Sequence, residues 1–146
     1  MVRISKLSDY AIQLLAAFVR EPPLALNARD VSGLAGIPEP TVKKLLKLLS
    51  RAGLLESRRG ALGGYRLSRD PEAITITEII AAVDGPIALT ECNEPGGDRC
   101  VRQTVCPLRG NWQRVNKVIE GALSHLTLSQ MAGTLSAWPA GRGGNP

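Results

Sequence analysis

The sequence predicts a mainly α-helical protein, a winged helix-turn-helix with a small β-hairpin wing and a long C-terminal dimerisation helix. Three observations support this class. Apolar residues recur at helical spacing in the first third of the chain, a glycine-rich turn then separates two strand-like runs, and a heptad-like apolar seam follows further on. Aromatic residues make up only 3% of the chain, so aliphatic side chains must build the core. That composition favours packed helices over a β-sandwich.

Three helices are expected before the glycine-rich turn. Residues 5–20 form the first. Asn27 caps a short second helix that ends at Gly36, and residues 41–52 form the third, with Pro40 in the first turn, where a helix accepts proline. A helix, a glycine-containing turn and a second helix with a basic outer face make up the helix-turn-helix arrangement.

The charge of the chain is concentrated in one window. The net charge is +5, but residues 43–69 hold eight basic residues and one glutamate, a net +7, which leaves −2 for the remainder. Lys44, Lys47 and Arg51 are spaced at i, i+3 and i+7 and therefore share one helix face. Lys43 and Lys47 repel each other at i, i+4, a cost that bound phosphates would remove. Such a block indicates a polyanion site; a solvated helix face is the alternative.

Residues 53–69 predict the wing. Two strand-like runs flank a turn that holds Gly60, Gly63 and Gly64, and glycine permits positive φ and lets the main chain approach a partner closely. The turn lacks the GxxxxGK[ST] spacing of a phosphate-binding loop, so we reject a nucleotide site of that kind. The third helix is expected in the major groove and the wing on the DNA backbone or minor groove. The residues expected to contact DNA are Thr41, Lys43, Lys44, Lys47, Arg51, Arg59, Gly63, Gly64 and Tyr65.

An apolar seam predicts the dimerisation helix. Its members follow one another at spacings of 4, 3, 4, 3 and 4, an a/d heptad pattern: Leu108, Trp112, Val115, Ile119, Ala122 and Leu126. We expect the seam to form a homodimer; packing of a single helix on its own domain is the alternative. The predicted division is a DNA-binding domain (1–85), a cysteine segment (86–107), a dimerisation helix with a final turn (108–137) and a disordered tail (138–146).

The chain has three cysteines, Cys92, Cys100 and Cys106, with seven and five residues between them. The start of the sequence lacks an apolar signal region, and no stretch approaches the roughly 18 apolar residues of a membrane span. We therefore expect a cytoplasmic protein, in which disulfides are uncommon and clustered cysteines indicate metal or redox chemistry. Pro107 is expected to start the long helix, which places Cys106 at the helix N-terminus.

The cysteine spacing favours an iron–sulfur cluster over zinc. Structural zinc normally takes four protein ligands from short C-x2–4-C pairs, and the spacings here are longer. A cluster held by three cysteines and a fourth group is the favoured interpretation. Zinc, a thiol–disulfide switch without metal, and unrelated structural cysteines are the alternatives.

The order of these motifs resembles a known family. RRGALGGYRLSR at the wing, EIIAAVDGPI at a helix end, and C-x7-C-x5-C followed by PLRGNW and the long helix are similar to the IscR/NsrR-type iron–sulfur winged-helix regulators over residues 1–137. Within this group, CPLRGNW most resembles the regulators of the SUF iron–sulfur assembly system. The resemblance implies a homodimeric transcription factor, a repressor of cluster-assembly genes that senses a bound iron–sulfur cluster, with 2Fe-2S favoured over 4Fe-4S.

Two positions depart from the pattern of this family. IscR-type regulators usually carry a histidine three residues after the last cysteine, where this chain has Arg109, and an acidic base-reading residue where it has Lys43. In nitric-oxide-sensing relatives, an early acidic residue in the first helix of the other subunit can complete the cluster. Asp9 has a similar place, and its alternative role is that of a first-turn acid favoured by the helix dipole.

Other groups are candidates for the fourth ligand. His125, the only histidine, is nineteen residues from Cys106, roughly 28 Å along a helix, which argues against it within one chain. Glu91, Glu94 and Asp98 stay open.

The sequence leaves two further functions open. The first is a nitric-oxide-sensing or redox-sensing repressor with a four-iron cluster. The second, of another class, is a cluster carrier or a zinc-stabilised interaction protein. No pairing of a base with a nucleophile is visible, so we do not expect an enzyme.

Overall fold

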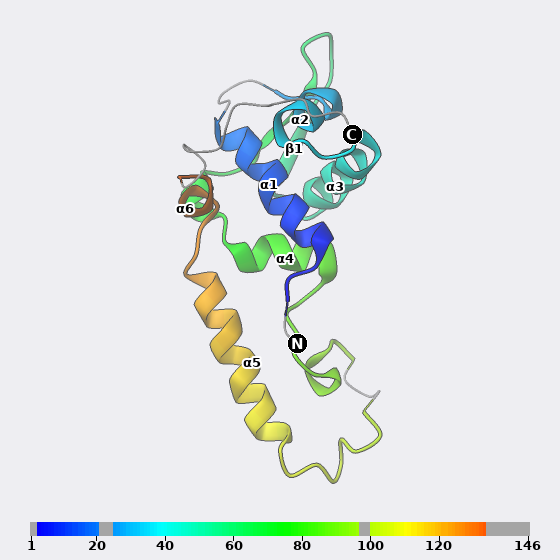
Figure 1. The fold of residues 1–146 in the computed structure, drawn as a ribbon, viewed down its shortest axis with the longest axis vertical. Helices are drawn as coiled ribbons and strands as arrows, with labels where there is room; N and C mark the ends of the chain where they lie inside the picture. Colours follow the sequence, from blue (N-terminus) through cyan, green and yellow to red (C-terminus); the bar gives the residue numbers. More distant parts are fainter. Residues whose placement is uncertain (1–2, 21–24, 97–99, 134–146) are drawn as a thin grey trace.

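The computed structural model describes residues 3–20, 25–96 and 100–133. Helices dominate these ranges, with one two-stranded sheet (Figure 1). The elements in chain order are α1 (Lys6–Arg20), α2 (Ala28–Ala35), α3 (Glu39–Arg51), β1 (Leu55–Arg58), β2 (Gly64–Leu67), η1 (Pro71–Ala73), α4 (Ile76–Asp84), η2 (Glu91–Asn93), α5 (Arg109–Ser124) and α6 (Leu128–Gly133).

The first four helices begin where the sequence supplies caps or proline. The Asn27 side chain accepts the backbone N–H of Asp30, whose carboxylate accepts the backbone N–H of Asn27, and this capping box starts α2. Gly36 ends α2 in the left-handed region at φ 68°. The predicted helix-turn-helix is thereby confirmed, with α3 beginning two residues before the predicted Thr41.

The core lies between α1, α3, α4 and α6. Its members are fully or almost fully buried aliphatic side chains from all four helices, and Leu14, Leu45, Ile79 and Leu128 are each 0% exposed. Leu128 belongs to α6, so the end of the described chain returns to the part of the molecule that holds the helix-turn-helix. Two backbone hydrogen bonds hold this return: Ile76 N–H donates to Leu126 C=O, and Leu128 N–H donates to Ile74 C=O. The predicted domain boundaries do not anticipate this packing and stay a prediction.

The wing is a β-hairpin with close contacts to its own chain. β1 pairs antiparallel with β2, and Leu26 bridges to Tyr65 through two backbone hydrogen bonds. A Cβ at Gly64 would lie 2.7 Å from the Leu26 carbonyl oxygen, and one at Gly63 would lie 2.7 Å from the Arg58 carbonyl oxygen. These two glycines therefore let main-chain segments of this chain pack closely, within the hairpin at Gly63 and against Leu26 at Gly64. A side chain at either position would displace the main chain.

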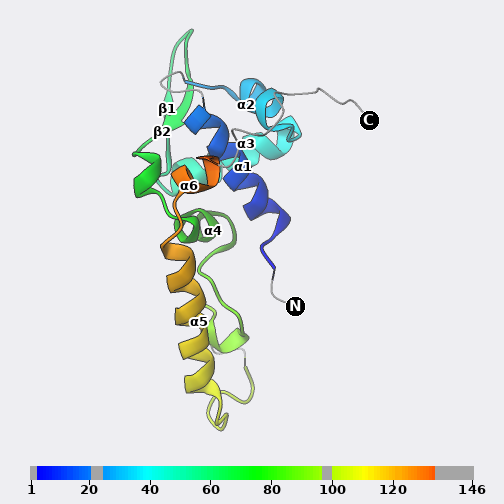
Figure 2. The same ribbon diagram turned by 60° about the vertical axis from the view of Figure 1, so that its left-hand side comes forward.

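The long helix α5 extends away from the core (Figures 1 and 2). The hairpin projects from the opposite end of the molecule in both views. Asn116 is the one buried residue of α5, while Trp112, Val115 and Ile119 are 41%, 43% and 38% exposed. The predicted seam is thus an exposed apolar stripe in the single chain.

The predicted start of α5 was wrong. The helix begins at Arg109 with Leu108 as its N-cap, and its first backbone bond runs from Trp112 N–H to the Leu108 carbonyl. Pro107 and Leu108 form a turn instead, closed by a bond from Arg109 N–H to the Cys106 carbonyl. Proline is compatible with a turn as well as with a helix start, and Pro107 adopts the turn. Cys106 therefore lies one turn before the helix N-terminus.

Residues 134–137 of the predicted final turn, and the predicted tail, lie outside the described residues. Among the described residues, no helix combines the length and the apolar character needed to cross a membrane.

Candidate nucleic-acid interface and cysteine segment

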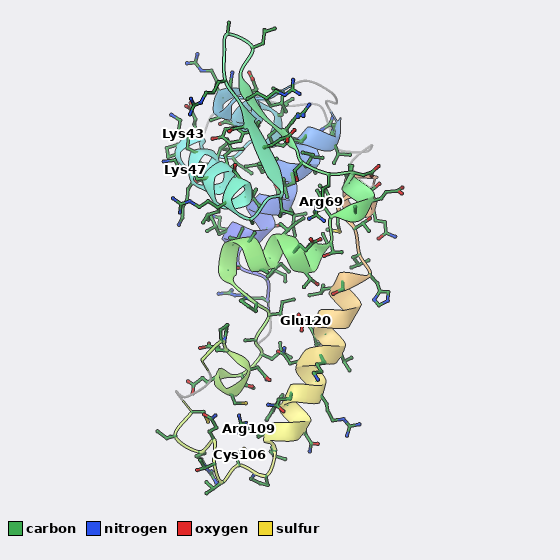
Figure 3. All side chains as sticks on the ribbon, turned by 180° about the vertical axis from the view of Figure 1, so that it is seen from behind. Lys43, Lys47, Arg69, Cys106, Arg109 and Glu120 are labelled. Atoms are coloured by element: carbon green, nitrogen blue, oxygen red, sulfur yellow. The ribbon has the colours of Figure 1, made fainter. Side chains whose placement is uncertain are left out.

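The basic face of α3 points away from the core. Val42, Leu45 and Leu49 bury one side of the helix, so residues offset from them by about half a turn face outward. Lys43 and Lys47 lie on this outward face (Figure 3). The exposed cations of the predicted interface on this helix are Lys43, Lys44, Lys47 and Arg51. Thr41, in the first turn, is half-buried.

Lys43 has a partner within its own helix. Its Nζ lies 2.9 Å from Glu39 Oε1, one turn earlier, and both side chains are exposed. The hydrogen bond and the charge of Lys43 hold the pKa of Glu39 below its ordinary value. Sequence reasoning missed this pair, although its i, i+4 spacing is visible in the sequence. Lys43 therefore already has a carboxylate partner, which competes with a phosphate for its charge.

The wing residues take different environments. Arg59 is exposed at the tip side of β1, beside the turn that holds Gly63. Tyr65 is half-buried and packs against the core, so its ring supports the hairpin from inside. Arg66 pairs with Glu56 across the two strands, which keeps one cation of the wing occupied.

The three cysteines are free and half-buried. Cys92 lies in η2, and its Sγ is 3.1 Å from Thr90 Oγ1. Cys106 precedes the turn at the start of α5, far from the basic face of α3 (Figure 3). Within residues 3–20, 25–96 and 100–133, no three His, Cys, Asp or Glu side chains are close enough together to hold one metal ion.

The candidates for a fourth ligand are separated in the single chain. Asp9 is exposed on the first turn of α1, where its Oδ2 accepts a hydrogen bond of 3.0 Å from Gln13 Nε2. His125 ends α5 at the helix terminus remote from Cys106, and its Nδ1 lies 2.6 Å from the Gly121 carbonyl oxygen. Glu91 and Glu94 are exposed beside Cys92, and Asp98 lies outside the described residues.

Asn116 ties the segment before Cys92 to α5, a role not predicted from the sequence. Its Oδ1 accepts the Leu89 N–H at 2.9 Å, and its Nδ2 donates to the Ile87 carbonyl at 2.9 Å. The signal that could have found it is a polar amide inside the amphipathic pattern of a long helix. Because both the oxygen and the nitrogen of the amide are hydrogen-bonded, burial of the side chain leaves neither atom without a partner.

An open groove of about 670 Å³ lies beside the end of α4. It is lined by the N-terminal arm, the end of α4, the segment 85–89 and α5. Ile80 and Ile87 give it apolar walls, while Arg3 and Asp84 are charged lining residues. The groove is continuous with the α5 stripe through Ile119.

These features define a class of protein. A helix-turn-helix with a basic outward face, an adjoining hairpin and a separate long helix with an exposed apolar stripe is the build of a winged-helix DNA-binding regulator. The chain belongs to the Rrf2 family of iron-dependent transcriptional regulators, which matches residues 4–134. The predicted fold class and the resemblance to IscR-type regulators are both confirmed.

Individual relatives support this assignment. The HTH-type transcriptional regulator IscR of Vibrio cholerae is 33% identical over 137 residues, which cover 89% of this chain and 75% of that protein. IscR of Serratia proteamaculans is 31% identical over 137 residues and 79% of its length. The structure of CymR, the global cysteine regulator of B. subtilis, is 27% identical with a TM-score of 0.69 and covers 92% of this chain and 98% of that one. The structure of T. potens IscR has the same TM-score at 24% identity, covers 97% of this chain and 94% of its own, and shows the fold alone.

Proposed function

We propose that this Rrf2-family regulator is a cytoplasmic homodimer that represses iron–sulfur assembly genes, of the SUF type, and senses cluster status through a bound iron–sulfur cluster. The observation that carries the proposal is the presence, in one molecule, of a segment with three free cysteines and of a basic helix, α3, that lies far from Cys106 (Figure 3). Such a chain has separate parts for sensing and for DNA reading, with helices between them.

The DNA-binding half of the proposal rests on α3 and the wing. Lys43, Lys44 and Lys47 would meet the major groove, while Arg59 and the Gly63 turn would contact backbone or minor groove. Phosphate contacts release counterions, so the logarithm of the DNA association constant falls linearly with the logarithm of the salt concentration, with a slope of about 0.9 in magnitude per neutralised phosphate. Lys47→Ala should weaken DNA binding and reduce the magnitude of this slope by about 0.9, the value of one phosphate contact. Lys117→Ala, on the exposed surface of α5, is the matched control and should leave the slope unchanged.

The chemistry of the donor set fits an iron–sulfur cluster, although in the single chain no three candidate ligands among the described residues are close enough together to hold one metal ion. Three free thiols in one short segment are soft ligands, and the hydroxyl of Thr90 lies against one of them. Cys92, Cys100 and Cys106 would hold the cluster, which supplies an oxidation-sensitive charge when bound. Asp9 of a second copy is the proposed fourth ligand, because it is exposed on α1 and can reach outside its own chain.

Dimerisation is supported by the exposed stripe on α5. Trp112, Val115 and Ile119 are large apolar residues that water contacts in the single chain. Burying them against the same stripe of a second copy would stabilise the pair by roughly 25 cal/mol per Å² of apolar surface. A two-fold dimer also places two recognition helices for two half-sites.

Anaerobic purification tests the sensing proposal. Visible and Mössbauer spectra with iron and sulfide counts should show a cluster bound to the wild-type protein. A colourless protein with stoichiometric zinc would contradict the proposal. A four-iron spectrum that nitric oxide bleaches would favour the second candidate, a nitric-oxide-sensing repressor. The exposed Asp9 on α1 is the observation that favours that candidate.

A further inference from the structure

A continuous chain of hydrogen bonds links α5 to the sulfur of Cys92. Asn93 Nδ2 donates to the main-chain oxygen of Trp112 on α5 at 3.4 Å and to Thr90 Oγ1 at 2.8 Å. Thr90 Oγ1 in turn lies 3.1 Å from Cys92 Sγ. The two hydrogens of one amide group therefore join the helix to the hydroxyl that contacts the thiol.

Donor and acceptor chemistry fixes the direction of this chain. A carbonyl oxygen only accepts and an amide nitrogen only donates, so the Trp112 carbonyl determines which end of the Asn93 amide faces it. The same nitrogen occupies one lone pair of Thr90 Oγ1. A Cys92 thiolate, the form that binds metal, has no proton to give. The Thr90 hydroxyl must then be the donor, and the bond to sulfur is charge-assisted.

The main chain before Thr90 is held by the same helix. The Asn116 side chain, in a residue only 8% exposed, bonds Leu89 N–H and Ile87 C=O, both at 2.9 Å. With Asn93 on the other side, α5 holds the chain both before and after Thr90. At the other two cysteines, Cys100 C=O accepts from Gln103 N–H and Cys106 C=O accepts from Arg109 N–H, and both bonds close local turns.

We propose that Thr90, Asn93 and Asn116 are positioning residues of the sensing site. They hold η2, and with it the ligand Cys92, in a fixed position against α5, and Thr90 donates a hydrogen bond to the sulfur of Cys92. This inference rests on the proposed function, because it gives roles to the surroundings of one cluster ligand. A hydrogen bond to a ligating sulfur stabilises the more negative, reduced state and so raises the reduction potential. The three residues would thus set both the place of Cys92 and the redox response of the site.

Two substitutions of Thr90 test the hydroxyl. Thr90→Val keeps the shape and removes the donor, whereas Thr90→Ser keeps the donor, and both are made in the full-length protein reconstituted anaerobically with iron and sulfide. Thr90→Val should give a more negative reduction potential and roughly tenfold faster iron release to a chelator, the range seen for outer-shell partners of metal ligands. Thr90→Ser should match the wild type. If Thr90 had a purely structural role, Thr90→Val would change the unfolding midpoint and leave the reduction potential unchanged.

Amide hydrogen exchange tests the Asn116 contacts without any metal. In the metal-free protein, Asn116→Leu should speed exchange of the Leu89 amide by roughly three- to tenfold, the value of one lost hydrogen bond. Asn116→Ala removes the same acceptor with a smaller side chain and should give a similar increase, which covers the case in which Asn116→Leu does not fold. Exchange at Leu89 that neither variant changes would overturn the role of Asn116.

The outcomes separate this inference from the function on which it rests. A wild-type protein that binds no iron overturns the proposed function and, with it, the ligand role of Cys92. A wild-type protein that binds a cluster, together with a Thr90→Val variant of unchanged potential and unchanged iron release, overturns this inference alone.

Discussion

The hydroxyl of Ser8 donates a 2.6 Å hydrogen bond to Oδ2 of Asp84, which joins the first turn of α1 to the last residue of α4. Ser8 is 0% exposed, and Asp84 is followed by the segment that leads to Cys92. One partly buried bond therefore lies where the helix-turn-helix part of the chain meets the segment that leads to the cysteines.

We predict that Ser8→Ala destabilises the protein by about 0.5–1.5 kcal/mol, the net value of a typical hydrogen bond. Ser8 is buried, but Asp84 is exposed, so water can replace part of the donor that the carboxylate loses. Urea unfolding followed by far-UV circular dichroism measures the change. Ser57→Ala, at an exposed position of β1, is the matched control and should shift stability by less than about 0.5 kcal/mol. Equal effects of the two substitutions would contradict the assignment.

A second prediction concerns acid stability. Burial opposes ionisation of Glu78, but hydrogen bonds from Thr75 and Arg69, with the charge of Arg69, outweigh it and hold the pKa of Glu78 below its ordinary value of 4.5. A lowered carboxyl pKa in the folded state stabilises the protein above that ordinary value, and this stabilisation is lost as the pH falls through the lowered pKa. Glu78→Gln should therefore destabilise the protein at pH 7 and differ less from wild type as the pH falls below 4.5.

Urea unfolding at several pH values checks this dependence. Glu72→Gln, an exposed neighbour on η1, is the control and should follow the wild-type curve. A constant difference between Glu78→Gln and wild type at all pH values would show that the carboxylate charge is not involved.

A third prediction follows from the Glu39–Lys43 pair. Glu39→Gln removes the carboxylate that occupies Lys43 and also a negative charge near the expected phosphates. DNA affinity should rise, and the salt slope should steepen by up to about 0.9, one additional phosphate contact. Fluorescence anisotropy titrations at several salt concentrations measure both quantities, with Glu72→Gln again as control. Unchanged affinity and slope would mean that Lys43 does not meet the DNA.

A fourth prediction concerns the stripe on α5. Ile119→Glu should convert a dimer into a monomer, because it introduces a charge where two apolar stripes are expected to meet. Gln113→Glu adds the same side chain on a different, exposed face of α5 and should leave the dimer intact. Sedimentation velocity distinguishes the two states. A dimer that survives Ile119→Glu would exclude this stripe as the interface.

Local signals in the sequence were enough for the DNA-binding half. The capping box of Asn27 and Asp30 spans four residues, and Gly36 follows the helix that it ends, so both can be found within a short window. The basic face of α3 follows from helical periodicity in the same way. These features depend on neighbours within one or two helical turns.

Long-range contacts limited the rest of the prediction. The hydrogen bonds between Ile76 and Leu126 and between Ile74 and Leu128 span about fifty residues, and no local pattern signals them. The role of Asn116 likewise depends on a segment nearly thirty residues earlier in the chain. The start of α5 depended on a choice between a turn and a helix at Pro107, which both conformations permit.

The pairing of Ile74–Ile76 with Leu126–Leu128 closes one long loop of chain, whose first element, α4, still packs in the core. Beyond α4 the chain leaves the core and returns at Leu126, so the point of return is bonded to the segment that leads into α4. A loop closed by such hydrogen bonds can change in length, or in the ligand that it holds, while the segments that lead out of and back into the core keep their positions. A protein with this arrangement can acquire a different loop between α4 and α6 without altering the helix-turn-helix.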